Sequence, residues 1–128
     1  MSRRTCLEQI EREPMMVVEQ QEKIEFTGIE WDTSGPAGCR LRAVPAHDGT
    51  VWNAVEYDAG ASRTAWCSRS HYGVVLEGQL TFEFEDGGEI SASAWEGYLI
   101  PGNRPHRGRN RGAERARAMM IDLPDAAS

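Results

Sequence analysis

Histidine is the side chain in this sequence best suited to chemistry near neutral pH, and it occurs at positions 47, 71 and 106. An imidazole titrates close to pH 7, so it can take or give a proton, and its neutral nitrogen is a common metal ligand. His47 stands beside the turn sequence Asp48-Gly49, which predicts an exposed position. His71 and His106 are therefore the candidates for catalysis, ligand contact or metal binding.

The other reactive side chains form weaker patterns. Cys6, Cys39 and Cys67 are odd in number and widely spaced, without a C-x-x-C pair, which argues against a disulfide scaffold or a structural zinc site. Ser68 has no adjacent base and lacks the G-x-S-x-G context of a hydrolase nucleophile. A serine or structural-zinc mechanism is not expected.

Charge and composition exclude several classes of protein. The formal net charge of -6 argues against general nucleic-acid binding, which needs a surplus of Lys and Arg. No apolar run approaches the roughly 20 residues of a membrane helix, and no signal segment opens the sequence, so we expect a cytoplasmic protein without membrane contact. With 128 residues and 40% hydrophobic content, one folded domain is predicted.

Arginine is concentrated near the C-terminus, where Glu114 is the only acid between residues 104 and 117. Two interpretations are open. The arginines form a solvated strand face that pairs with acidic surface elsewhere, or they recruit an anionic ligand. The cluster comprises Arg104, Arg107, Arg109, Arg111, Arg115 and Arg117.

Short strands must position the histidines, because most of the chain alternates β-branched and aromatic residues with turn signals. Leu80, Phe82 and Phe84 alternate with polar residues, so that strand lines the core on one side. Thr5 and Glu8 form a capping box, which predicts a short helix ending before Pro14. The predicted strands are 15–20, 24–27, 39–44, 50–57, 63–68, 72–77, 79–85, 89–94, 97–100, 105–110 and 116–122.

Two sequence segments resemble the motifs of the cupin family. His71 to Leu80 contains V-L-E-G, which is similar to the end of the first cupin motif, and Ile100 to His106, with Asn110 beyond it, is similar to the second motif, I-P-x-G-x-P-H-x-x-x-N. Gly102 departs from that pattern by one position. The resemblance implies an all-β, cupin-type double-stranded β-helix, or jelly-roll, barrel over residues 35–123. Residues 1–34 would add a short N-terminal helix and edge strands, and residues 124–128 a flexible tail.

The resemblance also implies an incomplete metal site. His106 matches the histidine of the second motif, and His71 falls at the acidic position of the first. The family's H-x-H pair puts two imidazoles on one strand face, but here neither alignment supplies one. Two ligands remain, or three if Cys67 points inward. The H-x-H pair would fall on Ala65 and Cys67 or on Thr64 and Trp66.

On the resemblance, four further residues are expected to contact a ligand. Trp66 would form a wall of the cavity, Ser68 would share its face, and Cys67 would then point away. Arg104 would lie at the barrel mouth, where it could clamp a carboxylate or phosphate. Tyr98 could supply a hydroxyl.

The function expected from these residues is binding of a small molecule, with acid–base catalysis of the isomerase, epimerase, cyclase or lyase type by His71 and His106. One alternative is a non-catalytic binding or sensor protein. The other is a metal-dependent enzyme with zinc, iron, manganese or nickel on an altered ligand set, whereas the first two need no cofactor. A homodimer is expected, because Met15 to Val18 forms an apolar edge strand.

Overall fold

The computed structural model describes residues 18–124, and every regular element in that range is a β-strand. The predicted helix near Thr5 and the start of the predicted edge strand at Met15 lie outside the described residues. The described part contains no helix that could cross a membrane. The strands are β1 (Cys39–Pro45), β2 (Val51–Tyr57), β3 (His71–Glu77), β4 (Gln79–Phe84), β5 (Glu89–Ser93), β6 (Gly97–Ile100), β7 (His106–Arg109) and β8 (Ala116–Asp122).

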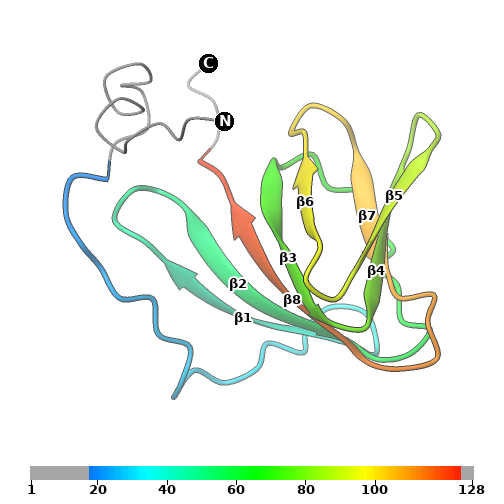
Figure 1. Ribbon diagram of the computed structural model, residues 1–128, viewed down its shortest axis with the longest axis horizontal. Coiled ribbons are helices and arrows are strands. Elements are labelled where there is room, and N and C mark those ends of the chain that lie inside the picture. Colours follow the sequence, from blue (N-terminus) through cyan, green and yellow to red (C-terminus); the bar gives the residue numbers. More distant parts are fainter. Residues whose placement is uncertain (1–17, 125–128) are drawn as a thin grey trace, which may run out of the picture.

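The strands form two antiparallel sheets that close a jelly-roll barrel (Figure 1). The larger sheet has the order β1-β2-β8-β3-β6, and the smaller has the order β5-β4-β7. Strands distant in sequence are therefore neighbours, since β8 lies between β2 and β3. The prediction of an all-β jelly-roll barrel is confirmed.

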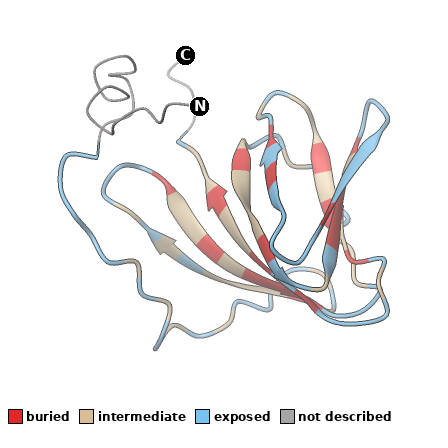
Figure 2. Cartoon of the chain, in the orientation of Figure 1, coloured by how far each residue is buried: buried red, intermediate tan, exposed pale blue. Residues whose placement is uncertain are grey.

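Alternation along the strands builds the core between the two sheets (Figure 2). On β4, Leu80, Phe82 and Phe84 are buried, as their spacing predicted. They meet inward residues of the larger sheet such as Val55 and Val75. Full burial of each such side chain contributes about 1.5–3 kcal/mol. The barrel is therefore held together by its interior, where the candidate histidines also lie.

Two glycines allow close contact between β3 and its neighbours. A Cβ at Gly73 would lie 1.9 Å from the carbonyl oxygen of Met119 and 2.7 Å from the hydroxyl of Tyr98. Gly78, the last residue of the V-L-E-G sequence, has φ of 75°, and its Cβ would lie 2.6 Å from the carbonyl oxygen of Arg115. The motif glycine thus makes the turn from β3 into β4 and passes close to the chain leading into β8.

Two predicted strands are not formed, and residues 18–20, the described end of the predicted strand 15–20, are also irregular. Residues 24–27 are irregular, and the nearest pairing to β1 is an isolated bridge between Asp32 and Leu41. Residues 63–68 run beside β7, but a bend at Ala65 interrupts the hydrogen-bond ladder, so only bridges at Ser62 and Cys67 remain. This segment, residues 61–67, is called the β7-flanking segment below.

The arginine cluster pairs with acidic side chains of the strands beside it. Glu83 on β4 lies within 3.5 Å of Arg107, Arg109 and Arg111. Glu56, 4% exposed, receives Arg117 at 2.7 Å. The first of the two interpretations, a strand face paired with acidic surface, describes these arginines.

Candidate functional site

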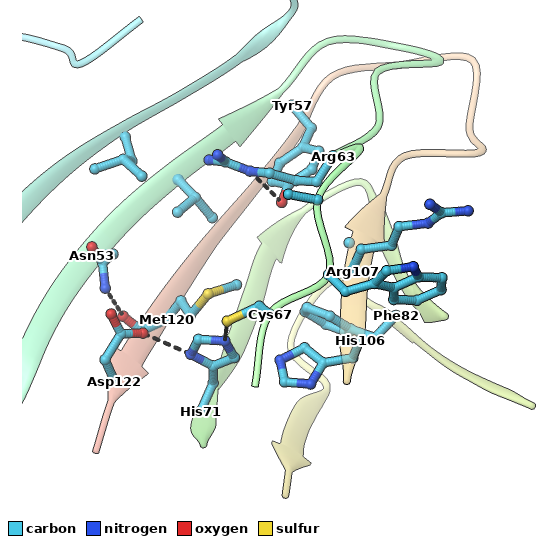
Figure 3. A pocket seen from close by; sticks show the side chains of 15 residues that line it. Asn53, Tyr57, Arg63, Cys67, His71, Phe82, His106, Arg107, Met120 and Asp122 are labelled. Carbon is cyan, nitrogen blue, oxygen red and sulfur yellow. Dashed lines mark hydrogen bonds and ion pairs between the residues drawn. The ribbon is translucent and has the colours of Figure 1, made fainter. Parts of the chain in front are cut away.

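A cavity of about 370 Å³ opens between the two sheets and contains both candidate histidines (Figure 3). Polar groups lie at its two ends, with His71 and Asp122 at one and Tyr57 and Arg63 at the other. Apolar side chains line it between them. These include Leu41, Val55, Phe82 and Met120. A cavity of this size and composition is typical of a site for one small organic molecule.

The structure brings His71 and His106 together, although 35 positions separate them in the sequence. Each is the first residue of its strand, β3 in the larger sheet and β7 in the smaller. Their ring centroids are 5.0 Å apart and the rings meet edge to face at 84°. His71 is 7% exposed and His106 is 1% exposed. Both imidazoles are thus fixed inside the barrel on opposite walls.

His71 is held as an imidazolium by its neighbours. Its Nδ1 donates to Oδ1 of Asp122 at 2.6 Å, and its Nε2 lies 3.5 Å from Sγ of Cys67. Burial alone would lower the pKa of His71, but the hydrogen bonds to Asp122 and Cys67 outweigh it and raise the pKa to about 9. His71 therefore carries a proton and a positive charge at neutral pH.

His106 is in the opposite protonation state, as a neutral imidazole. Its Nδ1 lies 2.8 Å from the carbonyl oxygen of Arg104, and a carbonyl can only accept, so Nδ1 carries the proton of the neutral ring. The other nitrogen, Nε2, is buried and has no hydrogen-bond partner among residues 18–124. Burial and the nearby charge of His71 lower the pKa of His106, with the bond to Arg104 opposing them. His106 therefore presents an unprotonated nitrogen to the cavity.

Cys67 faces the cavity, which corrects the expectation that it points away. Two backbone hydrogen bonds with His106, of 2.7 and 2.9 Å, set the phase of the β7-flanking segment and direct Sγ toward His71. The hydrogen bond to His71 lowers the pKa of the Cys67 thiol, although burial opposes this. The thiol thus joins the two imidazoles as a third reactive group.

These three groups fit a divalent metal ion. Sγ of Cys67 and one ring nitrogen of each histidine all lie within 4.8 Å of one another. The remaining ring nitrogens are tied to Asp122 and to a backbone carbonyl, as is usual for metal-ligating histidines. One thiolate and two imidazoles suit zinc or another borderline metal and leave a coordination position open.

The structure places the four residues expected to contact a ligand in different environments. Trp66 lines the cavity, is 38% exposed and packs its ring against Arg107 at 4.2 Å. Ser68 is exposed and does not line the cavity, because the segment turns Cys67 inward instead. Tyr98 lies behind the wall, where its hydroxyl donates to the carbonyl oxygen of Met119 at 2.7 Å.

Arg104 also lies away from the cavity. Its Nε is 3.0 Å from Asp86, its Nη2 donates to the carbonyl of Gly87, and its guanidinium covers the ring of Phe84 at 3.8 Å. The Arg104 side chain, which was expected at the barrel mouth, is therefore bound to the β4–β5 turn. Its contribution to the site is the backbone carbonyl that orients His106.

Asp122, Asn53 and Arg63 are polar cavity residues that the sequence analysis did not single out. Asp122 ends β8 and continues the inward alternation of Ala118 and Met120, so the period-two pattern could have placed it beside the site. Asn53 lines the cavity by the same alternation on β2. Arg63 had no such signal, because the β7-flanking segment is not a regular strand.

A jelly-roll barrel with a ligand-sized cavity and imidazoles on facing walls defines a class of small-molecule site. The sequence profile of the cupin domain matches residues 55–122, which is more than half of the 128 residues. The chain belongs to the cupin family. None of the curated proteins compared matches it.

Solved structures share this fold at low sequence identity. A protein of unknown function from Rhizobium leguminosarum is 21% identical, with a TM-score of 0.66 over 82% of this chain and 98% of that one. The polyketide cyclase RemF from Streptomyces resistomycificus is 16% identical, with a TM-score of 0.64 over 80% and 79%. A sugar phosphate isomerase of the cupin superfamily from Silicibacter pomeroyi is 17% identical, with a TM-score of 0.60 over 80% and 75%.

Proposed function

We propose that this cupin binds a small organic molecule in its cavity and catalyses proton transfer within it, with His106 as the base and His71 as the acid. The observation that carries the proposal is the buried Nε2 of His106, which has no hydrogen-bond partner in the described part of the chain and belongs to a cavity that also contains the imidazolium of His71. Two titratable groups whose environments push their pKa values apart are a recognised basis for assigning acid and base.

The proposed reaction is an isomerisation, epimerisation, cyclisation or elimination. His106 Nε2 removes a proton from a carbon next to a carbonyl group, and His71 donates a proton to the oxygen or carbon where negative charge develops. Asp122 keeps the imidazole of His71 oriented through the 2.6 Å hydrogen bond. The names of two structural neighbours, a cyclase and an isomerase, are compatible with this class, but their similarity concerns the fold.

Hydrogen–deuterium exchange into carbonyl compounds tests the proposal without a known substrate. Small ketones and β-keto acids are incubated with the protein in D₂O, and loss of the proton next to the carbonyl is followed by NMR. We expect exchange with the wild type and its loss in His106→Gln, with His47→Gln as the matched control. Binding of a compound that is never exchanged or converted would instead favour the non-catalytic sensor.

A metal-dependent enzyme is the second candidate, and the inward thiol of Cys67 favours it. Cys67, His71 and His106 would hold the ion, which would polarise a carbonyl oxygen of the ligand. Titration with Co²⁺ tests this, because a thiolate ligand gives a charge-transfer absorption. Cys67→Ser should abolish that band, whereas Cys39→Ser, at a buried cysteine outside the cavity, should keep it.

We also propose that the protein is a homodimer in which the outer faces of two larger sheets pack together. Cross-strand pairing places an apolar row over all five strands of this sheet, and its end, Leu99 on β6, is 78% exposed. Leu99 is exposed, Val44, Trp52 and Tyr72 are partly exposed and Ile121 is buried, so a second sheet would cover apolar surface that the single chain leaves in water. Sedimentation equilibrium should give a dimer for the wild type and for Ala113→Glu, and a monomer for Leu99→Glu. The row is Val44, Trp52, Ile121, Tyr72 and Leu99.

A further inference from the structure

Arg63 lies at the end of the cavity opposite His71 and Cys67 (Figure 3). It belongs to the β7-flanking segment, and its backbone N–H donates to the carbonyl of Gly108 at 2.9 Å. Its Nε lies 3.4 Å from the hydroxyl of Tyr57, a residue that is 3% exposed. The Nε side of the guanidinium is thus anchored on the cavity wall, and Nη1 lies against Gly35, where a Cβ would be 3.0 Å from it.

The two terminal nitrogens of Arg63 have no protein partner within residues 18–124. Neither makes a hydrogen bond there, and no carboxylate of these residues lies within 4.0 Å of the guanidinium. Arg107, the other arginine of the cavity wall, is already engaged by Glu83 and by the carbonyl of Thr64. Arg63 therefore differs from Arg107 in that both of its terminal nitrogens, with four N–H groups, lack a partner among the described residues.

The charge balance of the cavity also indicates that Arg63 lacks a close partner. At the far end, the positive charge of His71 is matched by Asp122 at 2.6 Å. Asp32 acts on the charge of Arg63 only from beyond 4.0 Å, without an ion pair or hydrogen bond, and Arg63 is partly buried, so a ligand that supplied a closer counter-charge would stabilise it. Apolar side chains, among them Val55 and Phe82, line the space between the two ends.

We infer that the natural ligand carries a carboxylate, which Arg63 binds with its two terminal nitrogens while the Tyr57 hydroxyl adds a hydrogen bond. A planar guanidinium fork matches a carboxylate in a bidentate geometry. A carboxylate is favoured over a phosphate dianion because one guanidinium supplies a single positive charge. The inference rests on the proposed function, since the apolar body of the ligand would then extend toward His106.

Matched pairs of small probes test the inference. Phenylacetate and phenylacetamide, and likewise hexanoate and hexanamide, differ in charge at nearly constant shape. We expect the carboxylate of each pair to bind at least about tenfold more tightly than the amide, as measured by NMR shift titration of the wild-type protein. In Arg63→Gln the ratio should fall to about one. Arg69→Gln, at an exposed arginine outside the cavity, should keep it.

Two further variants make the result independent of folding defects in Arg63→Gln. Tyr57→Phe keeps the ring and should weaken carboxylate binding without changing amide binding. Arg63→Lys keeps the charge but loses the fork, so its preference should be intermediate. Equal binding of carboxylate and amide by the wild type would overturn the inference, and so would stronger binding of inorganic phosphate than of either carboxylate.

The failure of this inference is distinguishable from failure of the proposed function. His106→Gln should keep the carboxylate preference while losing deuterium exchange. A wild-type protein that prefers carboxylates but never exchanges a proton would contradict the acid–base function and leave the role of Arg63 standing. Deuterium exchange into neutral ketones, without a preference for carboxylates, would contradict the role of Arg63 and leave the acid–base function standing.

Discussion

Replacing Asp122 with Asn should convert the imidazolium of His71 into a neutral ring at physiological pH. Asn is nearly the same shape as Asp, so the cavity is kept while the negative charge 2.6 Å from Nδ1 is removed. The hydrogen bond to Asp122 is the main contribution that opposes burial and raises the pKa of His71. Without it, burial favours the neutral form.

The size of the change follows from the raised pKa. The pKa of His71 rises from an ordinary 6.5 to about 9, which corresponds to about 3 kcal/mol in favour of the protonated form. Loss of the Asp122 contribution should lower the pKa of His71 to its ordinary value of 6.5 or below. The remaining hydrogen bond to Cys67 then only offsets part of the effect of burial.

NMR titration of the imidazole ring resonances measures this directly. The sequence contains three histidines, so single His→Gln variants assign the spectrum. In the wild type the resonances of His71 should titrate near pH 9, and in Asp122→Asn they should titrate at or below pH 6.5. If His71 already titrates near 6.5 in the wild type, or does not respond to Asp122→Asn, the assignment of His71 as the acid is wrong.

Four further predictions follow from the site and the core. Because the pKa of His71 is raised on folding, its contribution to the free energy of unfolding should be complete below about pH 6.5 and disappear as the pH rises through about 9, and Asp122→Asn should flatten this dependence in denaturant titrations. Gly73→Ala should prevent normal folding, visible as loss of the cooperative thermal transition, because its Cβ would lie 1.9 Å from the Met119 carbonyl. Phe82→Ala should cost about 3–5 kcal/mol in chemical denaturation, since the ring is 2% exposed and packs on Tyr98. In a Cys6→Ser background, iodoacetamide should modify Cys67 before the buried Cys39, and His71→Gln should slow that reaction at neutral pH, because the hydrogen bond to His71 lowers the pKa of the Cys67 thiol.

Period-two alternation was sufficient to predict most of the strands. The alternation of Leu80, Phe82 and Phe84 and the turn at Gly78 placed β3 and β4 close to their observed bounds. Residues 63–68 have the composition of a strand, but a bend at Ala65 breaks their pairing with β7. Such a bend depends on contacts with a strand 40 positions away, which local sequence does not encode.

The site was predictable where it depended on motif position and unpredictable where it depended on pairing partners. The meeting of His71 and His106 followed from the family resemblance. The inward direction of Cys67 is set by backbone hydrogen bonds to His106, and the position of Arg104 is set by Asp86 across the β4–β5 turn. Both are tertiary contacts, so the sequence alone could not distinguish Cys67 from Ser68, or Arg63 from Arg104, as the residue that lines the cavity.

The anchoring of Arg104 has a consequence for how molecules enter and leave the barrel. Its bonds to Asp86 and Gly87 fasten the loop before His106 to the neighbouring hairpin. We therefore expect this loop to keep its shape when a ligand enters or leaves. On the other side of β7, the β7-flanking segment, which carries Arg63, Trp66 and Cys67, is joined to that strand by isolated bridges. We therefore expect ligand entry and exit to displace the β7-flanking segment more than the loop that orients the ring of His106.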